Sequence, residues 1–124
     1  MFRSDERSIM NEYTSWHPKI FSAMNDLADE TYWSFTCELE YHWTKYQASL
    51  ACVREKLVRV VDLIDESPYG DHIRGQWNDL LNIFDIATKE KGSFERFYKS
   101  FYTLGKHFAN VMHRVEKLER KEIL

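Results

Sequence analysis

The sequence predicts an all-α protein, folded as a single up-and-down bundle of four to five helices. Its 124 residues fall within the usual size of one domain, and a hydrophobic content of 44% is ample for a packed core. Only 4 Gly and 2 Pro interrupt the chain, which leaves segments too long for the short strands of a sandwich or barrel. Residues 1–124 are therefore expected to form one helical domain.

The first thirty residues carry weak helical signals. Ser4 is a candidate N-cap, with Asp5 in the first turn that follows it. Another helix is predicted to begin near Pro18, because proline suits the first helical turn, and either His17 or Ser15 is expected to cap it, with a turn role also open to His17. The apolar positions of this helix are Ile20, Phe21, Met24, Leu27 and Ala28. We expect it to end near residues 29–31.

A long helix is predicted from Phe35 to Ile64. Its apolar residues recur at spacings of three or four, which makes a seam of about eight turns, and they are Phe35, Leu39, Trp43, Tyr46, Leu50, Val53, Leu57, Val60 and Ile64. Cys37 and Cys52 both fall on this helix, where a rise of about 1.5 Å per residue separates them by roughly 22 Å. They are therefore expected to stay unpaired, as small buried residues.

The next helix is bounded by turn residues. Pro68 and Gly70 mark the end of the long helix, and Asp71 is the expected N-cap of its successor. Gly92 is the expected C′ residue of that successor. The residues predicted to face inward are Ile73, Trp77, Leu80, Leu81, Phe84 and Ala87.

The last helix, expected over residues 93–122 with Ser93 as its cap, has the clearest pattern. Its apolar seam recurs at alternating spacings of three and four and consists of Phe94, Phe97, Phe101, Leu104, Phe108, Val111, Val115 and Leu118. Four Phe residues in this seam favour bulky core packing within a bundle over a slim two-stranded coiled coil.

The net charge of −3 is unevenly distributed. Residues 1–88 contain 8 Lys/Arg and 15 Asp/Glu, whereas residues 89–124 contain 9 and 5. This asymmetry fits either two oppositely charged faces that meet within the fold or a dimer, or a basic surface that meets phosphate. No run of about 18 apolar residues occurs, and no apolar segment follows the charged start MFRSDERS. We therefore expect a cytoplasmic protein without a membrane segment.

A polar stripe on the last helix is the main candidate for chemistry. Lys106, Asn110, His113 and Lys117 are spaced so that they share one face, roughly opposite the Phe seam. A lysine cation beside an imidazole can hold a phosphate while the imidazole moves a proton. His107 projects about 100° away from this face. The alternative interpretation is a polar helix face that is only solvated.

Neither a metal nor another cofactor is predicted. Glu38 and His42 are four residues apart with Glu40 nearby, but a metal site needs at least three ligands and no second helix offers a Glu-x-x-His pair. Asp62, Asp65 and Glu66 form an acidic cluster of the kind that can hold Mg²⁺ for nucleotide pyrophosphate hydrolysis. Such a site needs a second acidic pair facing the first, and none is evident. Glycine-rich phosphate loops and zinc-ligand spacings are absent.

The order of these elements resembles that of a known superfamily. A long helix containing YHWTKYQASLACVREKLVRVVDLI, a turn, a Trp-bearing helix and then FYKSFYTLGKHFANVMH is similar to the HEPN superfamily, the higher eukaryotic and prokaryotic nucleotide-binding domains. The resemblance covers about residues 30–120. The motif of this superfamily is an Arg, commonly followed by Asn, Asp or His, with four to six residues between the Arg and a His. Lys106, His107 and His113 match that layout, with Lys in place of Arg.

The resemblance implies a homodimer that acts on RNA or a nucleotide. Many members are metal-independent ribonucleases of toxin–antitoxin and defence systems, and the matching positions assign catalysis to Lys106 and His113. His107 and Asn110 would bind the substrate. Lysine keeps the charge of arginine but lacks the planar fork that grips phosphate oxygens in two places. A non-catalytic member that binds RNA, a nucleotide or a protein is therefore an equally consistent expectation.

A helical interaction protein without enzymatic activity is the alternative class. An immunity or antitoxin-like partner would use the acidic first two-thirds of the chain to engage a basic target. Aromatic residues would anchor such an interface if they are exposed, and the candidates are Trp16, Tyr32, Trp33 and Tyr41.

Overall fold

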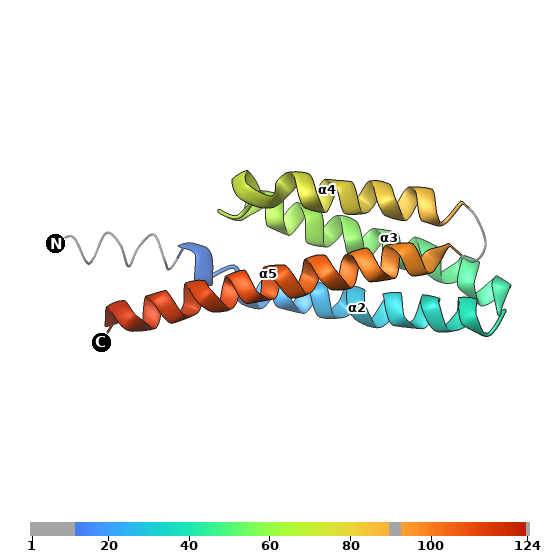
Figure 1. Cartoon of the computed structure of the whole chain (residues 1–124), viewed down its shortest axis with the longest axis horizontal. Coiled ribbons are helices and arrows are strands. Elements are labelled where there is room, and N and C mark those ends of the chain that lie inside the picture. The colour runs from blue at the N-terminus through green and yellow to red at the C-terminus, as the bar shows by residue number, and fades with distance from the viewer. Residues whose placement is uncertain (1–11, 90–92, 124) are drawn as a thin grey trace.

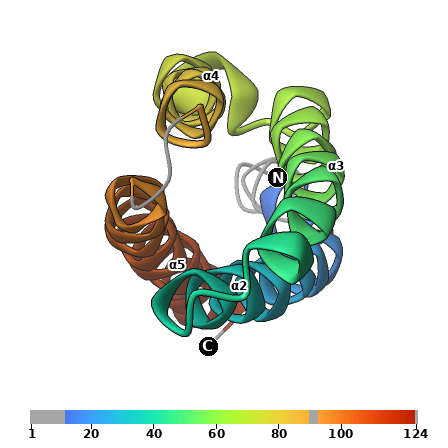
Figure 2. The same cartoon turned by 90° about the vertical axis from the view of Figure 1, so that its right-hand side faces the viewer.

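Four long helices form the fold in a computed structural model that describes residues 12–89 and 93–123. They are α2 (His17–Leu39), α3 (Trp43–Glu66), α4 (Gly70–Ala87) and α5 (Phe94–Ile123). Consecutive helices run in opposite directions (Figure 1). The end-on view shows them in chain order around the bundle, and α5 closes it by contacting α2 (Figure 2). The described residues contain no strand, and the predicted all-α up-and-down bundle is confirmed.

The predicted boundary between the first two long helices is wrong. α2 continues without interruption through Thr31, whose side chain is fully buried, and ends at Leu39. A short turn follows, in which Tyr41 has a φ of 59°, a left-handed value that few non-glycine residues adopt. The helix expected over residues 35–64 is therefore two antiparallel helices, and the two cysteines lie on different ones.

The turn between α3 and α4 lies where Pro68 and Gly70 predict it, but the cap differs by two residues. Tyr69 is the N-cap of α4, and Asp71 lies in its first turn. Only glycine fits at position 70, because a Cβ at this position would come within 2.7 Å of the backbone oxygen of Asp65. The two backbones can approach this closely only without a side chain.

The core forms where the inner faces of the four helices meet. Its largest fully buried side chains include Trp77, Tyr46, Phe94, Phe97, Phe108, Ile20, Leu27 and Leu57. The four Phe residues of the predicted α5 seam are buried. Met112, which the predicted seam does not include, is also buried, whereas Leu118, which it does include, is 50% exposed. The buried face of α5 shifts because a straight helix drifts by about 20° per heptad from a strict repeat. The C-terminal end of α5 also reaches beyond α3 and α4, so these helices do not cover it (Figure 1).

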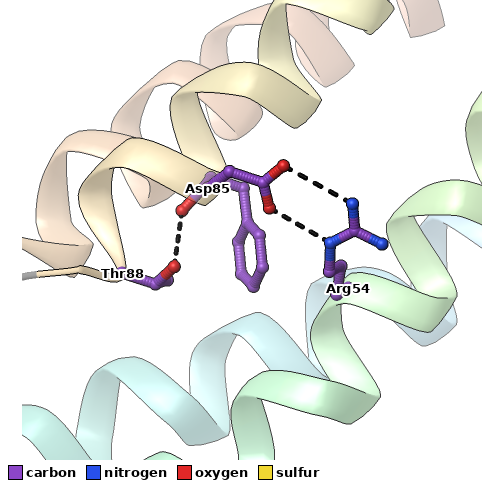
Figure 3. Close-up of polar contacts among 4 residues, drawn as sticks. Arg54, Asp85 and Thr88 are labelled. Carbon is purple, nitrogen blue, oxygen red and sulfur yellow. Dashed lines mark hydrogen bonds and ion pairs between the residues drawn. The ribbon is translucent and has the colours of Figure 1, made fainter.

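Polar contacts tie α4 to α3 at the surface. Arg54 on α3 grips the carboxylate of Asp85 on α4, with Nε–Oδ1 and Nη2–Oδ2 distances of 3.1 and 3.4 Å (Figure 3). The hydroxyl of Thr88 donates to a backbone carbonyl of the last turn of α4 at 2.8 Å.

None of the described helices combines the length and apolar character that a membrane crossing requires. The predicted cap Ser4 and C′ residue Gly92 lie outside the described residues.

Candidate functional site

The stripe predicted on the last helix lies on one exposed face of α5. Lys106, Asn110 and His113 are all exposed, on the side away from the buried Phe108 and Met112. Within the described part of the chain, none of the three side chains forms a hydrogen bond or an ion pair. The helix thus brings the predicted residues together on the outer surface of the bundle, where none of the other described helices covers them.

His107, one residue after Lys106, borders a different feature. It lines an open groove between α4 and α5 with a volume of about 550 Å³. The groove has an apolar floor and a polar rim, and its other lining residues include Leu80, Ile83, Leu104, Asp79, Lys99 and Thr103. The predicted role of His107 beside Asn110 would therefore have to be performed from the edge of this groove.

Exposed apolar side chains gather at the C-terminal half of α2 and in the turn after it. The exposed fractions are 64% for Tyr32, 49% for Trp33, 60% for Leu39 and 76% for Tyr41. We call these four residues the α2 patch. Trp16 does not belong to it, because this ring is partly buried and lies under the ammonium of Lys19, whose Nζ is 5.4 Å from the ring centroid.

The residues weighed as metal ligands have other partners. Glu38 is 6% exposed, and its Oε2 accepts a hydrogen bond from the backbone N–H of Phe94 at 3.2 Å. The Nε2 of His42 lies 3.3 Å from Oε2 of Glu40, and both side chains are more than half exposed. Among the described residues, no three His, Cys, Asp or Glu side chains are placed to hold a metal ion, Asp62, Asp65 and Glu66 included.

His17 forms a buried cluster that sequence reasoning misses. Its Nδ1 lies 3.0 Å from Oε1 of Glu116, and its Nε2 lies 2.7 Å from the hydroxyl of Tyr69. The His17 and Tyr69 rings stack with centroids 5.8 Å apart. The N-cap of α2 is Trp16, so neither His17 nor Ser15 caps the helix as expected. No local pattern indicates this cluster, because the two partners lie 99 and 52 positions away.

The contact with Glu116 places one proton of the cluster. A carboxylate of Glu116 can only accept, so Nδ1 of His17 carries a proton and donates it to this contact, while the Tyr69 hydroxyl is the partner of Nε2. Burial raises the pKa of Tyr69, with additional contributions from the nearby Tyr13 and Glu116, which keeps this hydroxyl a donor. The cluster joins the start of α2, the start of α4 and the C-terminal part of α5. Because His17 is only 3% exposed, the cluster is closed to a substrate.

In comparisons with protein-family models, curated proteins and solved structures, nothing matches this chain. Three surfaces of the molecule itself are candidates for function. They are the Lys106/Asn110/His113 face of α5, the α4–α5 groove and the α2 patch.

Proposed function

We propose that this chain is a helical protein-interaction module that binds a partner through the α2 patch. The proposal is supported by one observation above all: four large apolar side chains, three of them aromatic, are exposed within ten residues of the chain. Large exposed apolar side chains that are close together often mark an interaction site, and Tyr and Trp are enriched among the residues that dominate binding energy.

The core does not account for this exposure. Trp77, Tyr46 and Phe94 fill the interior with no exposed surface, so the bundle already has large aromatic side chains inside. Leaving Tyr32 and Trp33 outside forgoes burial that would contribute about 1.5–3 kcal/mol for a large apolar side chain. An interface that covers them recovers part of this free energy.

The acidic charge of the segment that carries the patch favours a basic partner. From Ile20 to Tyr41 the chain has no Lys, Arg or His, and it has five acidic residues, Asp26, Asp29, Glu30, Glu38 and Glu40. Asp26, Asp29 and Glu40 are exposed. Complementary charge at the rim of an interface increases the association rate and excludes wrong partners.

Capture experiments with the native cell extract test the proposal. We expect the parent protein to retain a partner that the double variant Trp33→Ser/Tyr41→Ser loses, and high salt to weaken the retention. Ile86→Ser is the matched control, because Ile86 is 55% exposed on α4, outside the patch. Equal capture by the parent and the double variant, both folded by circular dichroism, would contradict the proposal.

Action on RNA or a nucleotide is a second candidate, and one further feature of α5 favours it. Tyr102 is 62% exposed and lies one turn before Lys106, in line with Lys106 and His113. Bases of single-stranded RNA stack on exposed aromatic rings while cations contact the phosphates. As catalytic residues, Lys106 and His113 would need a cleft as well, and a second molecule would have to supply it.

RNA cleavage without added metal tests the second candidate. If His113 transfers a proton in the reaction, His113→Ala reduces the cleavage rate by about 10²–10⁴-fold. If the face only binds RNA, the parent leaves RNA intact and Tyr102→Ala weakens binding. Cleavage at equal rates by the parent and His113→Ala would remove His113 from the mechanism.

A further inference from the structure

Apolar side chains form a stripe across the outer side of α2 and α5. At its centre the rings of Phe35 on α2 and Tyr98 on α5 stack with centroids 4.7 Å apart, and both residues are partly buried. Tyr32 and Leu39 lie one turn on either side of Phe35, and Tyr102 lies one turn after Tyr98. Tyr32, Leu39 and Tyr102 are each at least 60% exposed. We call these five residues the α2–α5 stripe.

The two helices that carry this stripe have opposite charges. α2 and the turn after it have no basic residue between Lys19 and His42. α5 has no acidic residue between Glu95 and Glu116, and its basic residues in that interval are Arg96, Lys99, Lys106 and Arg114. An acidic segment and a basic segment, each about twenty residues long, therefore run antiparallel beside each other.

These opposite charges are largely unused within one molecule. Among the described residues, ion pairs between helices mostly join α2 to α3 and α3 to α4, and these are Glu30–Lys56, Arg54–Asp85 and Asp65–Arg74. Between α2 and α5, the acid–base contact in the described part is His17–Glu116, at the end of α2 remote from the stripe. Asp29 and Lys106 are exposed and form no ion pair with the described residues.

We propose that a second copy of this chain covers the α2–α5 stripe in a two-fold dimer. The proposal rests on the proposed function, since it assigns a partner to Tyr32 and Leu39 of the α2 patch. A two-fold axis that lies in the interface and runs parallel to the helices sets α2 of each molecule against α5 of the other. The acidic helix then meets the basic helix twice.

The register within one molecule determines which residues meet across this axis. Phe35 is level with Tyr98 and His17 is level with Glu116, because these side chains contact each other and the two helices run antiparallel. Residues at the same height face each other across an axis parallel to the helices. Tyr32 of one molecule therefore meets the partner's Tyr102, and the partner's Lys106 lies beside the segment that contains Asp29.

Sedimentation equilibrium tests the apolar part of this interface. We expect the parent to have twice the 15.0 kDa mass of the chain. The variant Tyr32→Ser/Tyr102→Ser is expected to raise the dimer dissociation constant by about tenfold or more, because each molecule loses two aromatic anchors. Ile86→Ser is the control and stays dimeric. A monomeric parent, or a double variant that dimerises as well as the parent, would overturn the proposal.

Charge reversal tests the pairing of α2 with α5. The variant Asn25→Lys/Asp29→Lys places two lysines on the α2 side of the contact, and the variant Lys106→Glu/Asn110→Glu places two glutamates on the α5 side. Each variant alone therefore places like charges opposite each other at this contact. An equal mixture of the two variants restores opposite charges at both contacts. We expect two weakened homodimers and one restored heterodimer. A mixture that associates no better than its components would contradict the pairing.

The oligomeric state also separates the two proposals. A monomeric parent whose capture of an extract protein depends on Trp33 and Tyr41 would contradict the dimer and support the proposed function. A monomeric parent that captures no protein would contradict both.

Discussion

The carboxylate of Glu38 accepts a hydrogen bond from the backbone N–H of Phe94, 56 positions later in the chain. Phe94 is the first residue of α5, where backbone N–H groups have no partner within the helix and a negative charge is favourable. Glu38 is buried near the end of α2. This contact therefore ties the start of the last helix to the end of α2.

Removal of the Glu38 carboxylate is expected to destabilise the fold. Glu38→Ala should lower the free energy of unfolding by about 1–3 kcal/mol, because it leaves a buried N–H without an acceptor. Glu38→Gln keeps an acceptor and should cost less. Urea denaturation measures both, with the exposed Glu40→Ala as the control. Equal losses in all three variants would show that the contact with Phe94 does not matter.

Two glycines of α4 are expected to respond in opposite ways to alanine. Gly70→Ala places a Cβ against the backbone oxygens of Ile64 and Asp65, at 2.9 and 2.7 Å, and should destabilise the protein by about 1–3 kcal/mol. Gly75 has nothing within 4 Å of an added Cβ, so Gly75→Ala should stabilise the helix by about 0.5–1 kcal/mol. Thermal denaturation compares them, and shifts of the same sign would contradict this expectation.

The buried Tyr69 predicts a loss of stability in alkali. Burial, with Tyr13 and Glu116 nearby, raises the pKa of Tyr69 above its ordinary value of about 10. The folded state therefore holds a proton that the unfolded state releases, so this stabilisation is complete below about pH 10 and declines as the pH rises through the raised pKa. The free energy of unfolding of the parent should fall more steeply above pH 10 than that of Tyr69→Phe.

Urea denaturation at a series of alkaline pH values makes this comparison. The pKa of Tyr46 is also raised, mainly by burial and further by the charge of Glu38. Because Tyr46 is present in both proteins, its contribution to the pH dependence is the same in both and does not affect the comparison. At neutral pH, Tyr69→Phe should cost about 1 kcal/mol for the lost hydrogen bond to His17. Parallel pH curves for the two proteins would rule out the contribution of Tyr69.

The two cysteines should differ in reactivity. Cys37 is buried on α2 and Cys52 is exposed on α3, so the expectation that both are buried holds for Cys37 alone. A thiol reagent should modify Cys52 in the folded protein and both thiols in denaturant, since a reagent needs access to the sulfur. Cys52→Ser should abolish the labelling of the folded protein. Rapid modification of Cys37 in the folded Cys52→Ser variant would contradict the structure.

The sequence by itself determined the features that depend on helical periodicity. The Phe seam of α5 is buried as expected, and Lys106, Asn110 and His113 share an exposed face because residues three, four and seven apart align on a helix. Periodicity does not say what lies opposite such a face. That the α2 patch is exposed, and that acidic α2 lies beside basic α5, became visible only once the helices were packed.

Only the tertiary structure decided where α2 ends and α3 begins. The hydroxyls of Ser34 and Ser49 lie 2.5 Å apart, although 15 positions on one continuous helix would separate them by roughly 22 Å. The apolar spacing runs in phase through the turn at Tyr41, so no local signal distinguishes one long helix from two. The turn forms because burial between the two helices outweighs the cost of a left-handed residue, and that burial depends on residues far apart in the sequence.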